Sequence, residues 1–447
     1  MEAGGDFCDV IVDYMNAHFD AEAHRQMGVE ADVVLRLGML LMGAGTSGYR
    51  VLRAMKRSAR ALGFNKLDAT VGLTQITCTF HRGPLFRTVI SRQHSPAVDA
   101  SRIEAIEDLT HNRLYAGITA EELSAMLDQI EHDVRKRWGR IILSLAAAVA
   151  CGAFAFLNSF PLEALGLVAV AAFAGQFMRH VALSNHVHQI GGIVAGGVTA
   201  SLVFFAITEF LGLIGAADPS DFSSGYVAAV LFLIPGFPLF SALIDMARFD
   251  FDAGLVRLAY AFCVIFAATF TVAMVSWLTD LNPEPPVPAT NLRWYCFAFV
   301  ASFCGIAGFA FLFNSSRRMV LVAAAVGTVA NGVRLGLLEL GTTPYFAAFV
   351  GGTIIGLLGA VASKAARLPR ITTTVPAAVI MIPGVTMFRA VYYLNAGEMD
   401  HAVANVATGM MVVASIGAGL VLSRLLTDPD WALGRLIDFS HQPPPKP

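Results

Sequence analysis

The sequence has few charged residues. Of its 447 residues, 14% are charged and 56% are hydrophobic, whereas soluble globular proteins contain about 25% charged residues. This scarcity of charge argues against a soluble protein and favours a membrane protein. The formal net charge is −2, so the chain also lacks the basic excess that nucleic-acid binding usually requires. We therefore expect no nucleic-acid partner.

Several motifs that carry chemistry are missing. The sequence contains no C-x-x-C, no H-E-x-x-H and no G-x-x-x-x-G-K-[ST], which argues against zinc-protease chemistry and against ATP hydrolysis within this chain. The six cysteines are scattered, and we expect small buried hydrophobic residues rather than disulfides or metal ligands. No catalytic set is recognisable, so we expect no enzyme, no cofactor and no metal.

The beginning of the sequence, MEAGGDFCDV, lacks a basic segment followed by an apolar run, so no cleavable signal peptide is predicted. Charged residues are frequent in residues 1–138, whereas residues 139–427 are almost wholly apolar. The first part mixes helical and alternating patterns. We expect residues 1–138 to form a small cytosolic α+β domain with a short antiparallel sheet.

Residues 43–48 of this domain, GAGTSG, match the G-x-G-x-x-G spacing of dinucleotide-binding loops. That fingerprint requires a strand before the glycines, whereas the preceding VVLRLGMLLM has a helical pattern. We therefore interpret Gly43 or Gly45 as the end of one helix, and Thr46 or Ser47 as the N-cap of the next.

The rest of the domain contains patterns of both kinds. Residues 66–80 alternate, and so do residues 85–92 after the turn HRGP; two helical patterns follow, near 99–112 and 119–137. Thr119 and Glu122 have the spacing of a capping box. Six histidines are scattered without a metal-binding spacing, so no metal site is predicted here.

The apolar part contains about ten segments of roughly the 20 residues that a membrane-crossing helix needs. They are residues 139–157, 162–183, 189–213, 225–247, 254–278, 292–313, 317–339, 344–366, 372–394 and 401–425. The predicted cytosolic connections carry Lys and Arg, including Arg248 and Arg257, whereas the five outer connections carry none. This alternation follows the positive-inside rule. It predicts a multi-pass inner-membrane protein whose N-terminal domain and tail (428–447) lie in the cytoplasm.

The first five predicted spans resemble the last five. CGAFAFLNS resembles GIAGFAFLFNS, and LIPGFPLFSAL resembles MIPGVTMFRAV. The separation of Arg179 from Gly196 is 17 residues, as is that of Arg334 from Gly351. Because five is odd, the second copy would enter the membrane from the opposite side. The sequence thus predicts two inverted five-helix repeats, 139–280 and 292–427, joined by a proline-rich outer linker at 281–291.

Each repeat contains a proline–glycine break near the middle of its fourth span. Unwound backbone at such breaks can present polar groups to a ligand, provided that it lines a cavity. The predicted substrate-binding residues here are Pro235, Gly236, Pro238, Pro383 and Gly384. The alternative is that the prolines only kink the helices while the glycines allow close packing.

Polar residues at membrane depth supply the remaining candidates. Gln176 and Arg179 share one face of their helix, as do Asn331 and Arg334. Guanidinium groups bind carboxylates in a forked geometry, so both pairs are predicted to bind a carboxylate-bearing substrate. The alternative is that the arginines extend to a membrane interface.

Two further positions follow the breaks. Ser241 and Asp245 come after the first break, and Arg389 and Tyr393 hold the equivalent positions after the second. Ser241 and Arg389 are predicted substrate contacts. Asp245 is the candidate for proton coupling, or for a pair with an arginine.

Three segments, GAGTSGYRVLRAMKRSARALGF, LIPGFPLFSALIDM and VIMIPGVTMFRAVYYL, resemble the threonine/serine exporter family. The similarity covers about residues 28–425. The resemblance implies a cytosolic N-terminal domain and about ten spans, with this chain similar to the fused form and joined within TDLNPEPPVPATN. Single-chain relatives are known as threonine and serine exporters, and two-subunit relatives are associated with dicarboxylate export, chiefly of succinate. Arg179 and Arg334 look more like the two-subunit branch, so both substrate classes stay open.

The expected function is therefore secondary active, proton-coupled export of small carboxylate-bearing metabolites, with threonine and serine as the first candidates. A succinate-type dicarboxylate is the alternative substrate. A membrane-anchored enzyme or a regulatory module in residues 1–138 is the alternative of another class. The expected partners are the substrate, protons and the lipid bilayer, with a homo-oligomer left open.

Overall fold

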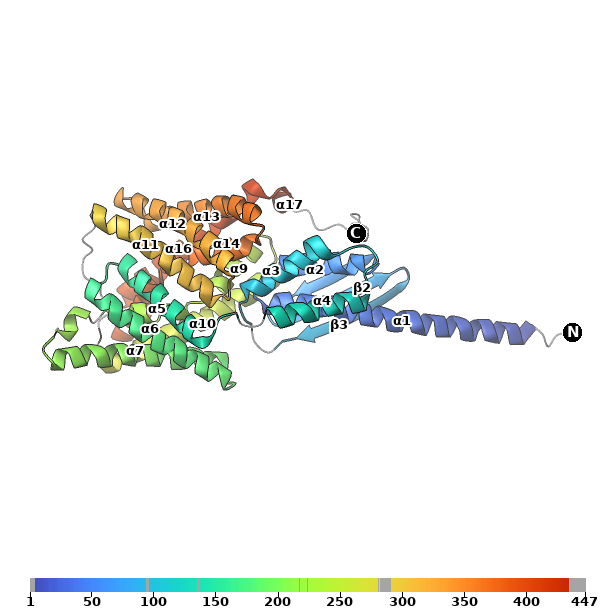
Figure 1. The fold of residues 1–447 in the computed structure, drawn as a ribbon, viewed down its shortest axis with the longest axis horizontal. Helices are drawn as coiled ribbons and strands as arrows, with labels where there is room; N and C mark the ends of the chain where they lie inside the picture. The colour runs from blue at the N-terminus through green and yellow to red at the C-terminus, as the bar shows by residue number, and fades with distance from the viewer. Residues whose placement is uncertain are drawn as a thin grey trace. The chain divides into compact units, whose positions relative to one another are not determined.

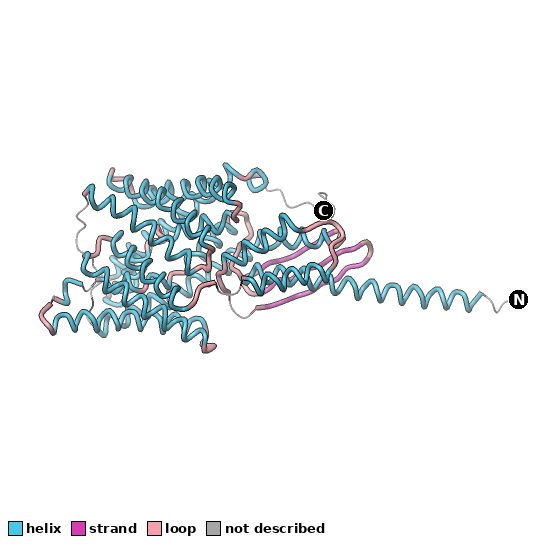
Figure 2. The backbone as a smooth tube through the Cα atoms, in the orientation of Figure 1, coloured by secondary structure: helices cyan, strands magenta, loops and turns pink. Residues whose placement is uncertain are grey.

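The computed structural model describes residues 5–93, 96–134, 137–216, 218–222, 224–279, 281 and 291–433. The chain divides into two compact units, which Figures 1 and 2 draw together. Among the described residues, the soluble unit comprises those within 1–97 and 105–135, and the membrane unit comprises those within 98–104 and 136–435. Each unit is described by itself below.

The soluble unit combines helices with a three-stranded sheet, drawn in magenta in Figure 2. Its elements are α1 (Gly5–Gly43), α2 (Gly48–Ala61), β1 (Lys66–Val71), β2 (Gln75–Arg82), β3 (Leu85–Arg92) and α4 (Ala120–Asp133). The sheet is antiparallel with the order β1-β2-β3. The α+β prediction is thus confirmed. Residues 66–80 are not one strand, however, because the chain turns back at Gly72, whose N–H donates to the carbonyl of Gln75.

The GAGTSG segment is a link between two helices. Helix α1 ends at Gly43, Gly45 adopts a φ of 85°, and Ser47 is the N-cap residue of α2. Only glycine adopts that φ without strain. The interpretation of this segment as a turn between two helices is confirmed, although the Ser47 side chain makes no capping hydrogen bond. The capping box of Thr119 and Glu122 is present at the start of α4, as predicted.

The helical pattern near residues 99–112 forms α3 (Ala100–Asp108), which continues as a π-helix over Leu109–Arg113. The segment 98–104 belongs to the membrane unit. There, the Ala100 N–H donates to the carbonyl of Phe313 at 2.9 Å, and the Ser101 hydroxyl donates to the carbonyl of Asn314 at 2.6 Å. These bonds fix the segment to the turn before α12.

The membrane unit is helical throughout its described residues, and the helix bounds follow the predicted spans closely (Figure 1). Its main helices are α5 (Arg140–Leu157), α6 (Leu162–Ser184), α7 (Gln189–Leu213), α8 (Gly225–Ala229), α9 (Gly236–Met246), α10 (Phe251–Thr279), α11 (Leu292–Leu312), α12 (Arg317–Glu339), α13 (Pro344–Ala366), α14 (Arg370–Val379), α15 (Gly384–Ala396) and α16 (Met399–Thr427). Within the described residues, eight helices are long and apolar enough to cross a membrane, or up to ten if each bent pair counts as one span.

The packing of the first helices recurs among the later ones. Helix α5 packs on α6, α6 on α7, and α9 on α10; correspondingly α11 packs on α12, α12 on α13, and α15 on α16. Helices α6 and α12 both have 23 residues, and α10 and α16 both have 29. Helices α5 and α11 pack on each other. The two sets therefore share lengths and neighbours.

The cysteines differ in their surroundings. Cys78 and Cys151 are buried, whereas Cys263 and Cys296 are exposed on the surface of the membrane unit. The prediction of buried cysteines is wrong for the latter two. An apolar run cannot distinguish a buried helix face from a face that lies against lipid, because both are apolar.

Candidate functional site

Both predicted proline–glycine breaks interrupt helices. The segments Gly225–Leu233 and Gly236–Met246 meet at an angle of 60°, and α14 and α15 meet at 50°. Helices α9 and α15 begin at Gly236 and Gly384, with Pro235 and Pro383 as their N-cap residues. A proline N–H is missing and its ring blocks the previous turn, so each helix must restart at this point.

The backbone is the same at both breaks. Pro235 has φ −81° and ψ 60°, and Pro383 has φ −79° and ψ 60°. The N–H of Gly236 donates to the carbonyl of Ile234 at 2.9 Å, and that of Gly384 donates to Ile382 at 2.8 Å. These are the dihedrals and the bond of an inverse γ-turn. The two breaks are thus one backbone motif that occurs twice.

The breaks also pack against each other. A Cβ on Gly236 would lie 2.7 Å from Val379 and 3.0 Å from Ile382. A Cβ on Gly384 would lie 2.5 Å from Ile234 and 2.6 Å from Leu231. Leu231 and Ile234 precede Gly236 by the same numbers of residues as Val379 and Ile382 precede Gly384. The contact is therefore reciprocal, as across a two-fold axis.

We call the contact between the two breaks, at Gly236 and Gly384, the crossing. The N-termini of α9 and α15 both lie there. The N-terminus of a helix carries a partial positive charge, which stabilises an anion. Of the first-turn N–H groups, those of Gly236 and Gly384 are used in the γ-turns and Pro238 has none, so the helix dipoles contribute more here than free N–H donors. The surrounding side chains are apolar and buried, including Phe237, Ile380 and Met381. Pro238 lies in the first turn of α9 and is partly buried. The crossing therefore offers backbone polarity within an apolar surrounding.

Arg179 lies near the end of α6, with its neighbours on three helices. Its Nη1 lies 3.5 Å from the side-chain oxygen of Gln176, which is buried. Tyr260 of α10 is within electrostatic range of Arg179, and its hydroxyl bonds to Gln189 of α7. The Nε atom of Arg179 is buried and has no hydrogen-bond partner in the described part of the chain. One strong donor is thus left for a further acceptor.

Arg334 holds the equivalent position on α12 and takes part in a chain of hydrogen bonds. Its Nε donates to the side-chain oxygen of Asn331 at 2.8 Å, and Asn331 donates to the hydroxyl of Ser302 at 2.8 Å. The Cβ of Arg179 lies against Gly196, as that of Arg334 lies against Gly351. The residues of each predicted pair are in contact, and the described hydrogen bonds keep each arginine within its own set of helices.

Asp245 forms a buried ion pair at the end of α9. Its Oδ2 accepts a hydrogen bond from Nη1 of Arg257 at 2.5 Å, and the two side chains are 0% and 2% exposed. The predicted alternative of a pair with an arginine is thus confirmed for Asp245. The sequence did not identify Arg257 as the partner, because this residue, although inside the predicted span 254–278, was counted among the basic residues of a cytosolic connection. Ser241 is also buried, and its hydroxyl donates to the carbonyl of Pro238 at 3.0 Å.

The second break is followed by aromatic residues. Tyr393 is buried with its ring 5.1 Å from that of His401. Arg389 is partly buried and within electrostatic range of Tyr226, whose hydroxyl donates to Ser276 at 3.0 Å. Tyr226 and Ser276 were not predicted, because a lone hydroxyl in an apolar run carries no pattern.

One further hydroxyl was missed. Thr373 of α14 is buried, and its Oγ1 has no hydrogen-bond partner within the described ranges. Helix α14 packs on α9, α11, α12 and α13. A buried polar atom without a partner is costly, which makes Thr373 a candidate contact for a bound molecule.

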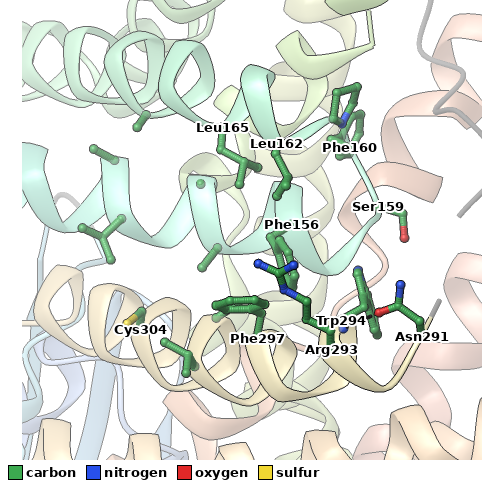
Figure 3. Close-up of a pocket in the computed structure, with 18 residues that line it drawn as sticks. Phe156, Ser159, Phe160, Leu162, Leu165, Asn291, Arg293, Trp294, Phe297 and Cys304 are labelled. Carbon is green, nitrogen blue, oxygen red and sulfur yellow. Dashed lines mark hydrogen bonds between the residues drawn. The ribbon is translucent and has the colours of Figure 1, made fainter. Parts of the chain in front are cut away.

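A crevice of about 900 Å³ lies elsewhere, between α5, α6 and α11. Phe156, Leu165 and Phe297 line it together with Arg293, whose guanidinium lies 5.8 Å from the centre of the Phe297 ring (Figure 3). None of the predicted substrate-binding residues lines this crevice. Its apolar walls suit hydrocarbon better than a carboxylate, so we do not assign the site to it.

The described residues contain no group of three or more His, Cys, Asp or Glu side chains that could hold a metal ion.

Two sequence models of protein families match the chain. The family described as "Putative threonine/serine exporter" matches residues 32–279, and that described as "Threonine/Serine exporter, ThrE" matches residues 298–426. The residues between the two matches include the linker predicted at 281–291. Together the matches cover the soluble unit from residue 32 onward and most of both sets of membrane helices.

Curated relatives come from both branches of this family. A "Probable succinate transporter subunit YjjP" of Escherichia coli is 22% identical over 252 residues, which are 56% of this chain and 94% of that protein. A "Probable threonine/serine exporter" of Mycobacterium tuberculosis is 21% identical over 440 residues, which are 93% of this chain and 80% of that protein. No solved structure matches the chain.

Proposed function

Because the chain belongs to the threonine/serine exporter family, we propose that it is a secondary active exporter of small carboxylate-bearing metabolites, with threonine and serine as its first candidate substrates. The reciprocal contact of Gly236 and Gly384 carries this proposal. Two broken helices that cross at their breaks are the usual setting of a substrate site in secondary transporters. The helix N-termini at the crossing would face the substrate carboxylate.

We further propose that α5–α10 and α11–α16 are inverted repeats. Matched helix lengths, matched γ-turns and reciprocal contacts support this. Both chain ends then lie in the cytoplasm and the protein resides in the inner membrane, as the basic connections favour.

The inverted arrangement gives the two arginines separate tasks. Arg179 lies six residues beyond Phe173, the midpoint of α6, and Arg334 lies six residues beyond Thr328, the midpoint of α12. Six residues of helix correspond to about 9 Å. In oppositely directed helices the arginines lie on opposite sides of the membrane midplane, about 18 Å apart along its normal. Arg179 would therefore attract substrate at the cytosolic mouth, and Arg334 would receive it at the outer mouth.

Asp245 is the proposed proton carrier. While it is ionised it holds Arg257, since buried opposite charges stabilise each other. Protonation of Asp245 would release Arg257 and loosen α9 from α10. A proton that enters from outside could thus drive the change of conformation that returns the empty carrier.

A dicarboxylate is the second candidate substrate. It is favoured by the similarity to the succinate transporter subunit. We also propose that the soluble unit regulates transport rather than catalyses a reaction. Deletion of residues 1–130 would then alter the rate of transport without abolishing it.

The test uses the purified protein in proteoliposomes. Efflux of labelled threonine, serine and succinate is measured with and without an imposed pH gradient. Faster efflux of one substrate along with inward proton movement supports the proposal. Lack of movement of all three would defeat it, and equal efflux at all pH gradients would remove the proton coupling alone.

A further inference from the structure

One face of α2 in the soluble unit is strongly basic. Arg50, Arg53 and Arg57 follow each other at intervals of three and four residues, so their side chains share a face of the helix. Arg50 is buried and forms an ion pair with Glu107. Within the described residues this is the one ion pair of the three arginines, and Glu107 attracts Arg53 and Arg57 only from a longer distance.

Arg53 and Arg57 are held in place without an ion pair of their own. The guanidinium of Arg53 lies 5.7 Å from the centre of the Tyr49 ring. The Nη1 atom of Arg57 is buried and has no hydrogen-bond partner in the described ranges. Burial, and then repulsion by Arg53, lowers the pKa of Arg57. A buried guanidinium donor that is left unpaired is costly, so the site is incomplete as it stands.

His111 approaches the same face from the π-helix. Its Nδ1 lies 2.8 Å from the carbonyl oxygen of Glu107, and it therefore donates there. Burial, then repulsion by Arg57 and Arg53, lowers the pKa of His111, while the carbonyl and carboxylate of Glu107 oppose this. Single π-helical turns are frequent at functional sites. The turn here places an imidazole beside two unpaired guanidinium groups.

The charges in this cluster do not balance. Three guanidinium groups stand against the single carboxylate of Glu107, which leaves two positive charges in excess. Guanidinium groups bind oxyanions in a forked, doubly hydrogen-bonded geometry. An occupant with two negative charges would neutralise the excess and accept the free donor of Arg57.

We propose that Arg53, Arg57 and His111 form a binding site for a small dianion, either a dicarboxylate or phosphate, on the soluble unit. The site is separate from the helix breaks and does not depend on the identity of the exported substrate. Occupancy of this site would make the state of the soluble unit depend on the concentration of an anionic metabolite.

The test measures binding of succinate and of inorganic phosphate to the full-length protein in detergent, by calorimetry at constant ionic strength. The Arg179→Gln, Arg334→Gln variant serves as the background, because it lacks the two membrane-unit arginines that are proposed to bind substrate. We expect one site per chain, and Arg57→Gln or Arg53→Gln added to this background should weaken it at least tenfold. Arg25→Gln, which also removes one exposed positive charge from the soluble unit, should leave it unchanged.

The pH dependence provides a second readout. A bound dianion favours the protonated imidazole, so affinity for the dianionic form of the ligand, calculated from the fraction of ligand that is doubly ionised at each pH, should rise as the pH falls from 7.5 to 5.5. His111→Gln should abolish this rise while retaining binding at pH 7.5. Equal affinity of Arg57→Gln and the background, or an equal loss in Arg25→Gln, would overturn the proposal, as would failure of both anions to bind. Whichever of succinate and phosphate binds more tightly identifies the source of the ligand.

Discussion

The carboxylate of Asp245 lies 2.5 Å from the guanidinium of Arg257, and both side chains are buried. The pair joins the end of α9 to the first turns of α10. The equivalent positions after the second break are Tyr393 and Asn405, which are uncharged at neutral pH. The membrane unit therefore carries this charge pair in one half, and a proton carrier that works once per cycle needs no second copy.

Replacement of Asp245 by Asn should destabilise the protein strongly. It leaves the guanidinium of Arg257 buried without its counter-charge, and the loss of one partner of a buried pair costs about 3–5 kcal/mol. The measurement is the thermal unfolding midpoint of the purified protein in detergent, alongside proton-driven transport. We expect both to fall.

The matched control removes both charges. Asp245→Leu combined with Arg257→Met should recover most of the stability, because no buried charge is then left unpaired. Transport should stay uncoupled from the pH gradient in this variant. Restored coupling in the double variant would show that Asp245 carries no proton.

Gly236→Ala should impair transport more than stability. The added Cβ would lie 2.7 Å from Val379, and overpacking of this kind costs about 1–3 kcal/mol. The added methyl group would push the two breaks apart at the crossing. Efflux from proteoliposomes should fall several-fold, and Gly384→Ala, with its Cβ 2.5 Å from Ile234, should act in the same way.

A compensating change separates packing from other effects. Val379→Ala removes the nearest atoms that the new Cβ meets and leaves the end of the Ile382 side chain at 3.0 Å, so the Gly236→Ala, Val379→Ala variant should regain most of the transport. Gly166→Ala on α6 and Gly336→Ala on α12 have open space for a Cβ and should behave as the unchanged protein. A similar loss in these two controls would mean that the crossing has no special role.

The inverted arrangement predicts opposite locations for two equivalent turns. Asn185 follows α6 and Leu340 follows α12, and both are exposed. In a cysteine-free background, Asn185→Cys should react with a membrane-impermeant maleimide only from the cytosolic side. Leu340→Cys should react only from the outside. Labelling of both from one side would exclude inverted repeats.

The helix bounds could be predicted from the sequence because each span is a long apolar run that ends in polar or proline residues. The segment predicted at 317–339 is α12, Arg317–Glu339. The breaks were predictable too, since proline and glycine interrupt the apolar runs at matched positions. What the sequence could not predict was the contact between them, because Gly236 and Val379 lie far apart along the chain.

The partner of Asp245 illustrates a different limit. Arg257 was assigned to a cytosolic connection, because a basic residue at the start of an apolar run fits the positive-inside rule. Arg257 falls inside the predicted span 254–278 and lies in the second turn of α10, where the packing of α10 on α9 buries it. Burial of a charge depends on a neighbour in space, which a pattern along one helix does not contain.

Loss of each arginine should affect transport from one side of the membrane. Arg179→Gln should raise the KM for substrate supplied on the cytosolic face, with little effect on substrate supplied outside, because the proposed position of Arg179 is about 9 Å to the cytosolic side of the midplane. Arg334→Gln should do the reverse in counterflow experiments with oriented vesicles. Arg179→Lys should not restore the low KM fully, since an ammonium group cannot make the forked contact with a carboxylate. If both Gln variants raise KM equally from both sides, the two arginines act at one common site and their assignment to separate mouths is wrong.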